Sequence, residues 1–205
     1  MIKINSYNQN MLQENTYILL DEASNEGIVV DPGCYPPAMK TMLATFSKLK
    51  YIVLTHGHGD HIAAIDELRE DYPDAVVVAG VREKDLLNDS ENNGSKQFAS
   101  HPIQLDANLY VKDGDTLKLG ETEYQFIETP GHTSGGICMY GNQTIFTGDT
   151  LFFHSIGRTD FHSGNPTEMK SSLARLMTLP DDTVVYPGHG LSTTIGNEKK
   201  GNPFV

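Results

Sequence analysis

Hydrophobic residues in the first third of the chain form short runs that turn-forming residues separate. Three of these runs predict consecutive strands that open the fold as an antiparallel sheet, at residues 2–5, 15–21 and 27–33. Residues 37–48 then carry apolar side chains at helical spacing and predict a helix. An apolar run at 51–54 follows, and we expect it to be a buried strand.

The spacing of the apolar residues changes after residue 60. Ile62, Ile65 and Leu68 fall on one helical face and charged residues fall on the others, so we expect a helix here. Asp60 stands where the N-cap of that helix would be. The elements expected next are a buried strand at 75–79, a short helix at 82–88 and a polar loop or mobile flap at 88–97.

The second half of the chain repeats this alternation. We predict a turn leading into a strand at 113–120, a further strand at 123–129, and two strands about a Gly-Asn turn at 135–149. A helix at 166–177 and a final strand at 183–186 complete the pattern. Two similar halves of this kind favour an α+β fold in which sheet packs on sheet with helices outside.

Length and composition are those of an ordinary globular protein. The chain has 205 residues, of which 38% are hydrophobic and 20% charged, and we expect residues 1–205 to form one domain. No apolar run approaches the roughly 20 residues of a membrane helix, so we expect no membrane association. The N-terminus lacks a basic start followed by an apolar run, and we therefore expect a cytoplasmic protein.

The charge balance and the cysteines narrow the range of partners. Lys and Arg total 15 against 27 Asp and Glu, and this net charge of −12 argues against a nucleic-acid partner. The two cysteines, Cys34 and Cys138, are too few for a disulfide scaffold, so we expect free thiols. The sequence leaves the oligomeric state open.

Candidate metal ligands crowd the end of the apolar run at 51–54. Four of them stand within six positions, namely His56, His58, Asp60 and His61. Side chains two residues apart in extended backbone point the same way, so His56 and His58 can converge on one ion. Three further candidates each follow a glycine at the end of a predicted strand: His132, Asp149 and His189.

This mixture of imidazole and carboxylate favours zinc or a similar borderline ion. One ion rarely needs seven ligands, whereas two ions use them if a carboxylate bridges the pair and water fills the remaining positions. A structural zinc site in a binding protein is the non-enzymatic alternative, but such sites often use cysteine and neither cysteine lies in the cluster. Three other histidines lack paired ligand spacing and are left outside the site: His101, His154 and His162.

Four sequence motifs resemble the metal motifs of the metallo-β-lactamase-fold hydrolases: THGHGDH at 55–61, TPGHTSGG at 129–136, FTGDTLF at 146–152 and YPGHG at 186–190. The resemblance covers nearly the whole chain, including DPG at 31–33. It implies an αββα four-layer sandwich with the metal site at the edge between the two sheets. It further implies His56, His58 and His132 on a first metal, Asp60, His61 and His189 on a second, and Asp149 as the bridge.

Within that superfamily, residues 155–166 and 188–204 are most similar to the short bacterial glyoxalase II-like thioesterases. The similarity implies hydrolysis of a small-molecule hydroxyacyl thioester by a metal-bound hydroxide, which Asp60 would orient. It also implies two divalent ions, zinc first, with iron or manganese as alternatives. Full-length glyoxalase II has a C-terminal helical domain that contacts glutathione, and we expect this chain to lack it. The acyl and thiol parts of the substrate therefore stay open.

A different reaction class shares part of this pattern. Persulfide dioxygenases have the GRTDF stretch found here at 157–161 and hold a single iron with ligands equivalent to His56, His132 and Asp149. Hydrolysis of a lactone or a β-lactam is a further alternative within the superfamily. Arg158 is the best candidate for binding an anionic substrate, because a guanidinium can grip a carboxylate with two hydrogen bonds. An internal ion pair of Arg158 with Asp160 is the alternative for that side chain.

Overall fold

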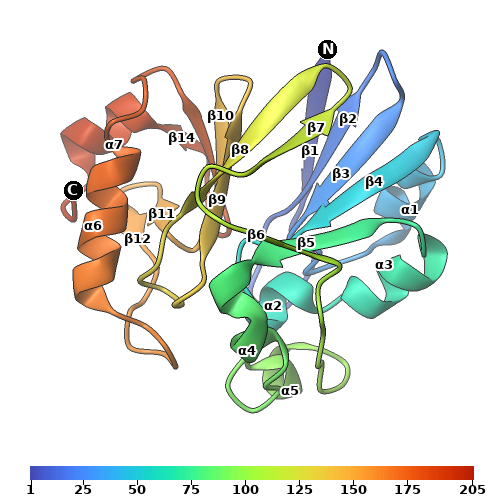
Figure 1. Ribbon diagram of the computed structural model, residues 1–205, viewed down its shortest axis with the longest axis horizontal. Helices are drawn as coiled ribbons and strands as arrows, with labels where there is room; N and C mark the ends of the chain where they lie inside the picture. The colour runs from blue at the N-terminus through green and yellow to red at the C-terminus, as the bar shows by residue number, and fades with distance from the viewer.

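The computed structural model describes residues 1–205 and consists of two six-stranded sheets packed face to face (Figure 1). The first sheet has the order β1-β2-β3-β4-β5-β6, with strands Ile2–Tyr7, Thr16–Asp21, Glu26–Val30, Lys48–Val53, Val76–Gly80 and Leu109–Val111. The second has the order β14-β13-β10-β9-β8-β7, and in that order its strands are Thr193–Thr194, Val184–Pro187, Thr144–Gly148, Ile137–Gly141, Thr122–Glu128 and Thr116–Leu119. A separate hairpin pairs β11 (Leu151–Phe152) with β12 (Ser155–Ile156).

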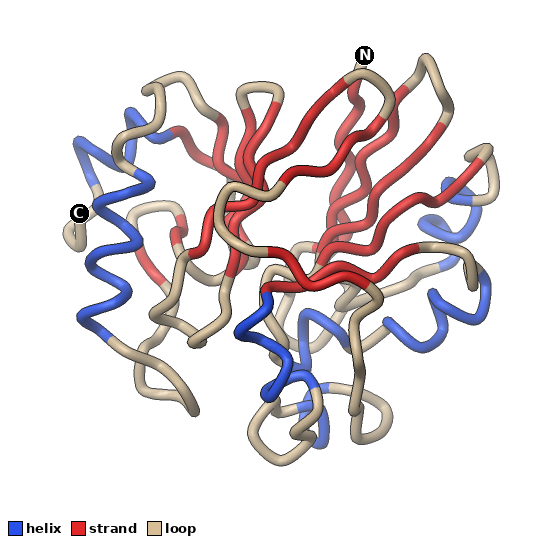
Figure 2. Tube along the Cα trace, in the orientation of Figure 1, coloured by secondary structure: helices blue, strands red, loops and turns tan.

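Helices cover the outer face of each sheet (Figures 1 and 2). Those on the first sheet are α1 (Pro37–Leu43) and α3 (Ile65–Asp71), and those on the second are α6 (Pro166–Leu176) and α7 (Ile195–Gly201). The shorter helical segments lie at the lower edge in Figure 1: α2 (Gly59–Ile62), the 3₁₀ turn η1 (Val81–Glu83), α4 (Lys84–Leu87) and α5 (Ser95–Phe98). None of the helices is long and apolar enough to cross a membrane.

The alternation of side chains along the strands builds three apolar layers. In β2, Ile18 belongs to the apolar cluster that includes Met39 of α1, whereas its neighbour Leu19 belongs to the cluster that includes Phe126 of the opposite sheet. A third cluster joins the outer face of the second sheet to α6, where Leu173 is buried. Three apolar layers between four layers of secondary structure confirm the predicted αββα sandwich.

The opening of the fold follows the prediction, and one helix does not. Strands β1, β2 and β3 are antiparallel as expected, and the sheet then becomes parallel from β3 to β6. The helix predicted at 37–48 ends at Leu43, so the prediction of its length is wrong. The physical reason is strand pairing, because Lys48 already pairs with Glu26 at the start of β4.

The expectation that Asp60 caps a helix is also wrong. Asp60 lies inside α2, and the N-cap residue is His58, whose side chain makes no capping hydrogen bond. The carboxylate instead approaches His189, with 3.2 Å between Asp60 Oδ2 and His189 Nε2. The sequence predicts one helix in this region, but the structure has two, because α2 and α3 are separated at residues 63–64.

The polar segment at 88–97 is attached to the body of the protein. It leads into α5. The backbone carbonyl of the buried Asn93 accepts a hydrogen bond from the amide of Gly59, at 2.6 Å. A side chain at Gly59 would collide with Ser95, since a Cβ there would lie 2.6 Å from Ser95 Cα. This segment therefore packs directly against the turn that carries the candidate ligands.

Candidate metal centre

The seven predicted ligands stand at strand ends that share one edge of the sandwich. In the second sheet, β8 and β10 run the same way because each is antiparallel to β9, and β10 is parallel to β13. Their carboxyl ends therefore open at one edge, where they deliver His132, Asp149 and His189. The end of β4 and the following α2 deliver the other four ligands from the first sheet.

The side chains form two groups at this edge. In the first ligand group, His56, His58 and His132 each offer a nitrogen within 4.8 Å of the others. In the second ligand group, Asp60, His61 and His189 do the same with a carboxylate oxygen and two nitrogens. The groups match the sets that the sequence motifs imply for two metals.

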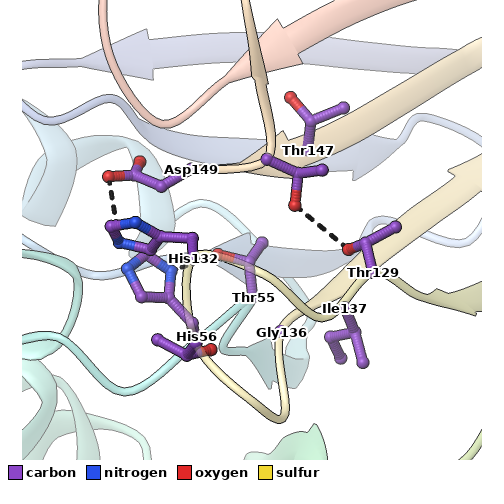
Figure 3. Close-up of a pocket in the computed structure, with 10 residues that line it drawn as sticks. Thr55, His56, Thr129, His132, Gly136, Ile137, Thr147 and Asp149 are labelled. Carbon is purple, nitrogen blue, oxygen red and sulfur yellow. Dashed lines mark hydrogen bonds and ion pairs between the residues drawn. The ribbon is translucent and has the colours of Figure 1, made fainter. Parts of the chain in front are cut away.

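Asp149 lies between the two groups. Its Oδ2 is 3.5 Å from His132 Nε2 in the first group, and its Oδ1 is 3.3 Å from His61 Nε2 in the second. Figure 3 shows the Asp149 carboxylate facing His132, with His56 beside them. A carboxylate in this position can serve both groups at once, as a bridging ligand does.

Unpaired polar atoms indicate what the cluster fits. His56 Nε2, His61 Nε2 and Asp149 Oδ1 are buried and have no hydrogen-bond partner. An unpaired buried polar atom costs about 1–3 kcal/mol, which a bound cation offsets by accepting the lone pair. The donor set of imidazole and carboxylate is also the one that borderline divalent ions prefer. These residues therefore fit divalent metal ions.

Hydrogen bonds behind the ligands fix their orientation. His132 Nδ1 donates to the carbonyl of Arg158 at 2.7 Å, and His61 Nδ1 donates to Asp31 Oδ2 at 3.0 Å. Asp31 is held in turn by Thr55, which donates to it from both its amide and its hydroxyl. Each imidazole thus keeps its other nitrogen, Nε2, directed into the cluster.

The electrostatic environment differs between the groups. Burial, with help from neighbouring imidazoles, lowers the pKa of His56, and it lowers the pKa of His58 to about 3. Burial acts the same way on His61, but the carboxylates of Asp149, Asp60 and Asp31 outweigh it and raise the pKa of that imidazole. His56 and His58 are therefore neutral imidazoles ready to bind a cation.

Two acidic residues near His61 were not among the predicted site residues. Asp31 entered only as part of the DPG turn, and Glu14, which is fully buried, did not enter at all. Glu14 Oε1 lies 3.9 Å from His61 Nδ1, and burial raises the pKa of this carboxyl group. A hydropathy pattern carries no signal for such a residue, because a buried acid and an exposed acid are alike in sequence.

A small polar cavity lies directly behind the cluster (Figure 3). It measures about 10 Å³, which is room for about one water molecule. Five threonines line it together with His56, His132 and Asp149: Thr55, Thr129, Thr133, Thr147 and Thr150. The space behind the ligands is therefore polar and nearly filled, so it offers no room for a substrate.

A larger cleft of about 600 Å³ opens in front of the cluster. Its walls come from the segment after residue 88, which supplies Phe98, and from the loop after β12, which supplies Arg158 and Phe161. Arg158 forms a two-point ion pair with Asp160, through Nε at 2.9 Å and Nη2 at 2.8 Å. Its guanidinium also lies over the Phe161 ring, at 4.2 Å from the centroid.

The three histidines left outside the predicted site take different positions. His101 pairs with Asp66 on the surface, and His154 stacks on Phe153. His162 lines the cleft, although it belongs to neither ligand group. The sequence offered no spacing signal for His162, since its place in the cleft depends on how the loop after β12 folds.

Comparison with protein families and curated proteins gives consistent matches. A family model described as the metallo-beta-lactamase superfamily matches residues 10–189. Hydroxyacylglutathione hydrolase GloC of Haemophilus influenzae is 35% identical over 200 residues, covering 94% of this chain and 93% of its own length.

Solved structures are similar over almost the whole chain. BLEG-1, a B3 metallo-beta-lactamase, has a TM-score of 0.89 and 33% identity, covering 98% of this chain and 99% of its own. ETHE1 from Myxococcus xanthus has a TM-score of 0.80 and 34% identity, covering 98% and 83%. TTHA1623, solved in a di-iron-bound form, has a TM-score of 0.83 and 30% identity, covering 98% and 100%.

Proposed function

Because this chain belongs to the metallo-beta-lactamase superfamily, whose members are mostly metal-dependent hydrolases, we propose that it hydrolyses a hydroxyacyl thioester in the manner of glyoxalase II. The relative GloC supports the thioester, since its name is that of a hydroxyacylglutathione hydrolase. The superfamily also contains enzymes such as the B3 metallo-beta-lactamase BLEG-1, so similarity of fold leaves the substrate to be argued from the site.

The observation that carries the proposal is the pair of ligand groups with Asp149 between them. The first group would hold one ion, the second group another, and Asp149 would bridge the two. When bound, such a pair supplies a water acidified enough to attack at neutral pH and a positive charge for the carbonyl oxygen. We take zinc as the first choice of metal, with iron and manganese as alternatives.

The chain's own residues would orient the reaction. Asp60 lines the cleft, and its Oδ2 approaches His189. The other carboxylate oxygen of Asp60, Oδ1, would accept a hydrogen bond from the attacking water. A thiolate is a fair leaving group, so no residue is needed as a strong acid. Arg158 lines the same cleft, and its Nη1 takes no part in the pair with Asp160, so this group would bind an anionic part of the substrate.

The test is an assay coupled to metal analysis. Purified protein is supplied with S-lactoylglutathione, thiol release is followed, and metal per chain is measured on the same sample. We expect thiol release with two metals per chain. The variant His58→Ala should lose hydrolysis and one metal, because it removes a ligand of the first group. Retention of activity and of both metals in that variant would contradict the proposal.

A second candidate is a mononuclear iron dioxygenase acting on a persulfide. Two observations favour it: the first ligand group with Asp149 can hold a single ion on its own, and the chain is similar to ETHE1 over 98% of its length. Glutathione persulfide distinguishes the candidates when oxygen is monitored. Oxygen uptake by protein that contains one iron supports the dioxygenase. Absence of oxygen uptake supports the hydrolase.

A further inference from the structure

We propose that Glu83 is a positioning residue, which keeps the first ligand group in place by joining the two loops that carry it. The ligand loops are residues 55–58, which include His56 and His58, and residues 132–136, which begin at His132. The inference rests on the metal centre of the proposed function and is independent of the substrate.

Glu83 bonds to both ligand loops through its two carboxylate oxygens. It ends the 3₁₀ turn η1 directly after β5, and its side chain is completely buried. Oε1 accepts a hydrogen bond from the amide of Gly57, at 2.8 Å. Oε2 accepts one from the hydroxyl of Thr133, at 3.0 Å. Gly57 lies between His56 and His58 in the chain, and Thr133 directly follows His132, so each bond acts beside a ligand.

The second loop packs against Glu83 so closely that only glycine fits. A Cβ at Gly135 would lie 2.5 Å from Glu83 Oε2 and 2.2 Å from Glu83 N. The amide of Gly135 also interacts with this carboxylate and favours its charged form. Three groups from two loops therefore converge on one carboxylate, which leaves the loops little freedom to move apart.

A carboxylate in this position is costly to bury. Burial raises the pKa of Glu83 to about 7, and the hydrogen bonds from Gly57 and Thr133 offset only part of that rise. The adjacent Arg82 is half exposed and is directed to Glu168, with 3.6 Å between Arg82 Nη2 and Glu168 Oε1. An apolar side chain would fill the space at less cost, but it could not accept hydrogen bonds from both loops.

The support is specific to the first ligand group. The backbone of the second group is held elsewhere, since Asn10 donates to the carbonyl of Asp60 at 2.9 Å. Its imidazole His61 is fixed by Asp31. None of these bonds involves Glu83, so its removal should weaken metal binding at one group and spare the other.

Glu198 offers a matched control. It is also completely buried, and it accepts hydrogen bonds from Thr193 Oγ1 at 2.6 Å, His154 N at 2.8 Å and Asn202 Nδ2 at 2.9 Å. None of these partners is next to a candidate ligand in the chain. The two glutamates are thus alike in burial and bonding, and they differ in whether their partners carry metal ligands.

The experiment measures zinc affinity by chelator competition for each ligand group separately. His189→Ala removes a ligand of the second group and leaves the first group to bind, and His58→Ala does the reverse. In the His189→Ala background we expect Glu83→Ala to lower affinity about 10–100-fold, the usual effect of removing support behind a ligand. In the His58→Ala background, Glu83→Ala should change the zinc affinity less than about 2-fold. The control Glu198→Ala should change it less than about 2-fold in both backgrounds.

The conservative variant Glu83→Gln should restore part of the affinity, because its amide oxygen still accepts one of the hydrogen bonds. If Glu83→Ala does not fold, Glu83→Gln and Thr133→Val take its place in the same comparison. The melting temperature of the metal-free protein reports the general structural cost, which we expect to be similar for Glu83→Ala and Glu198→Ala.

Two results would overturn the inference: unchanged affinity of the first group without Glu83, or equal losses in both groups. Failure of the wild-type protein to bind zinc, iron or manganese would instead contradict the proposed function.

Discussion

The two ligand groups lie side by side but are supported in different ways. The second group has carboxylates directly behind its ligands, because His61 bonds to Asp31 and lies near the buried Glu14. In the first group the support nearest the imidazoles is neutral, such as the carbonyl that accepts from His132. A carboxylate therefore bonds directly to an imidazole of the second group, whereas the carboxylate of Glu83 supports the first group only through the loops that carry its ligands.

This difference appears in the imidazoles themselves. The pKa of His58 is lowered to about 3, mainly by burial, and that of His61 is raised because nearby carboxylates outweigh burial. A carboxylate behind an imidazole makes it a more basic ligand. Two adjacent ligand groups can thus differ in their electrostatics because of the residues behind them, and substitutions at those residues should separate the two groups.

The largest effect is expected where the two groups meet. Asp149→Ala removes the carboxylate that approaches both His61 and His132, so both metals should be lost and kcat should fall by at least about 10²–10³-fold. Elemental analysis and thiol release measure the two outcomes. A variant that keeps two metals would show that the groups do not depend on a shared ligand.

The carboxylate behind the second group gives the next largest effect. Asp31→Asn retains the shape of the side chain and removes its charge, so the affinity of the second group should fall about 10–100-fold. The first group should lose less affinity, because Asp31 reaches it only indirectly, through Thr55, whose hydroxyl contacts His56 Nδ1. Chelator competition in the His58→Ala and His189→Ala backgrounds measures each group. Equal losses in both would contradict the contrast between them.

The pH dependence of stability tests the support of the first group. Glu83 has an ordinary pKa of 4.5, raised to about 7 in the folded protein. A raised folded-state pKa stabilises the protein fully below 4.5, and this stabilisation is lost as the pH rises through 7. At about 1.4 kcal/mol per unit, the contribution of Glu83 to the free energy of unfolding of the metal-free protein should fall by about 3 kcal/mol across this window.

Urea unfolding at several pH values measures this dependence, and Glu83→Gln provides the control because it cannot titrate. The difference between the two proteins should change over the window between pH 4.5 and 7. A difference that stays constant with pH would contradict the expectation that Glu83 changes its protonation state in the folded protein.

The smallest effect is expected in the cleft, outside both groups. The pair of Arg158 and Asp160 is about two-thirds exposed on each side, and solvent screens an exposed pair so strongly that it contributes little to stability. Asp160→Asn should therefore raise kcat/KM for an anionic thioester by no more than about 5-fold and leave both metals bound. Arg158→Ala should raise KM. Michaelis kinetics with metal analysis check both, and loss of metal in either variant would contradict this account.

Much of the fold and the choice of ligands could be predicted from sequence, because both depend on local patterns. Alternating apolar residues indicated the strands, and glycine followed by a ligand at strand ends indicated His132, Asp149 and His189. These features act over a few residues. The structure brings all seven predicted side chains to one edge of the sandwich.

The residues behind the ligands could not be predicted in this way. Glu14 and Glu83 are acids in segments whose pattern is compatible with exposure, and only the packing of distant loops buries them. The end of α1 was misplaced for the same reason, since Lys48 pairs with Glu26 across the sheet. Asp60 was expected both at a helix cap and in the second ligand set, and the structure retains only its approach to His189.

The most direct test of the central claim is anomalous X-ray scattering from crystals of the protein grown with zinc. We expect two peaks about 3.5–4 Å apart, one beside each ligand group, with the Asp149 carboxylate between them. A single peak, or peaks away from these seven side chains, would contradict the claim that the two groups hold a bridged pair of ions.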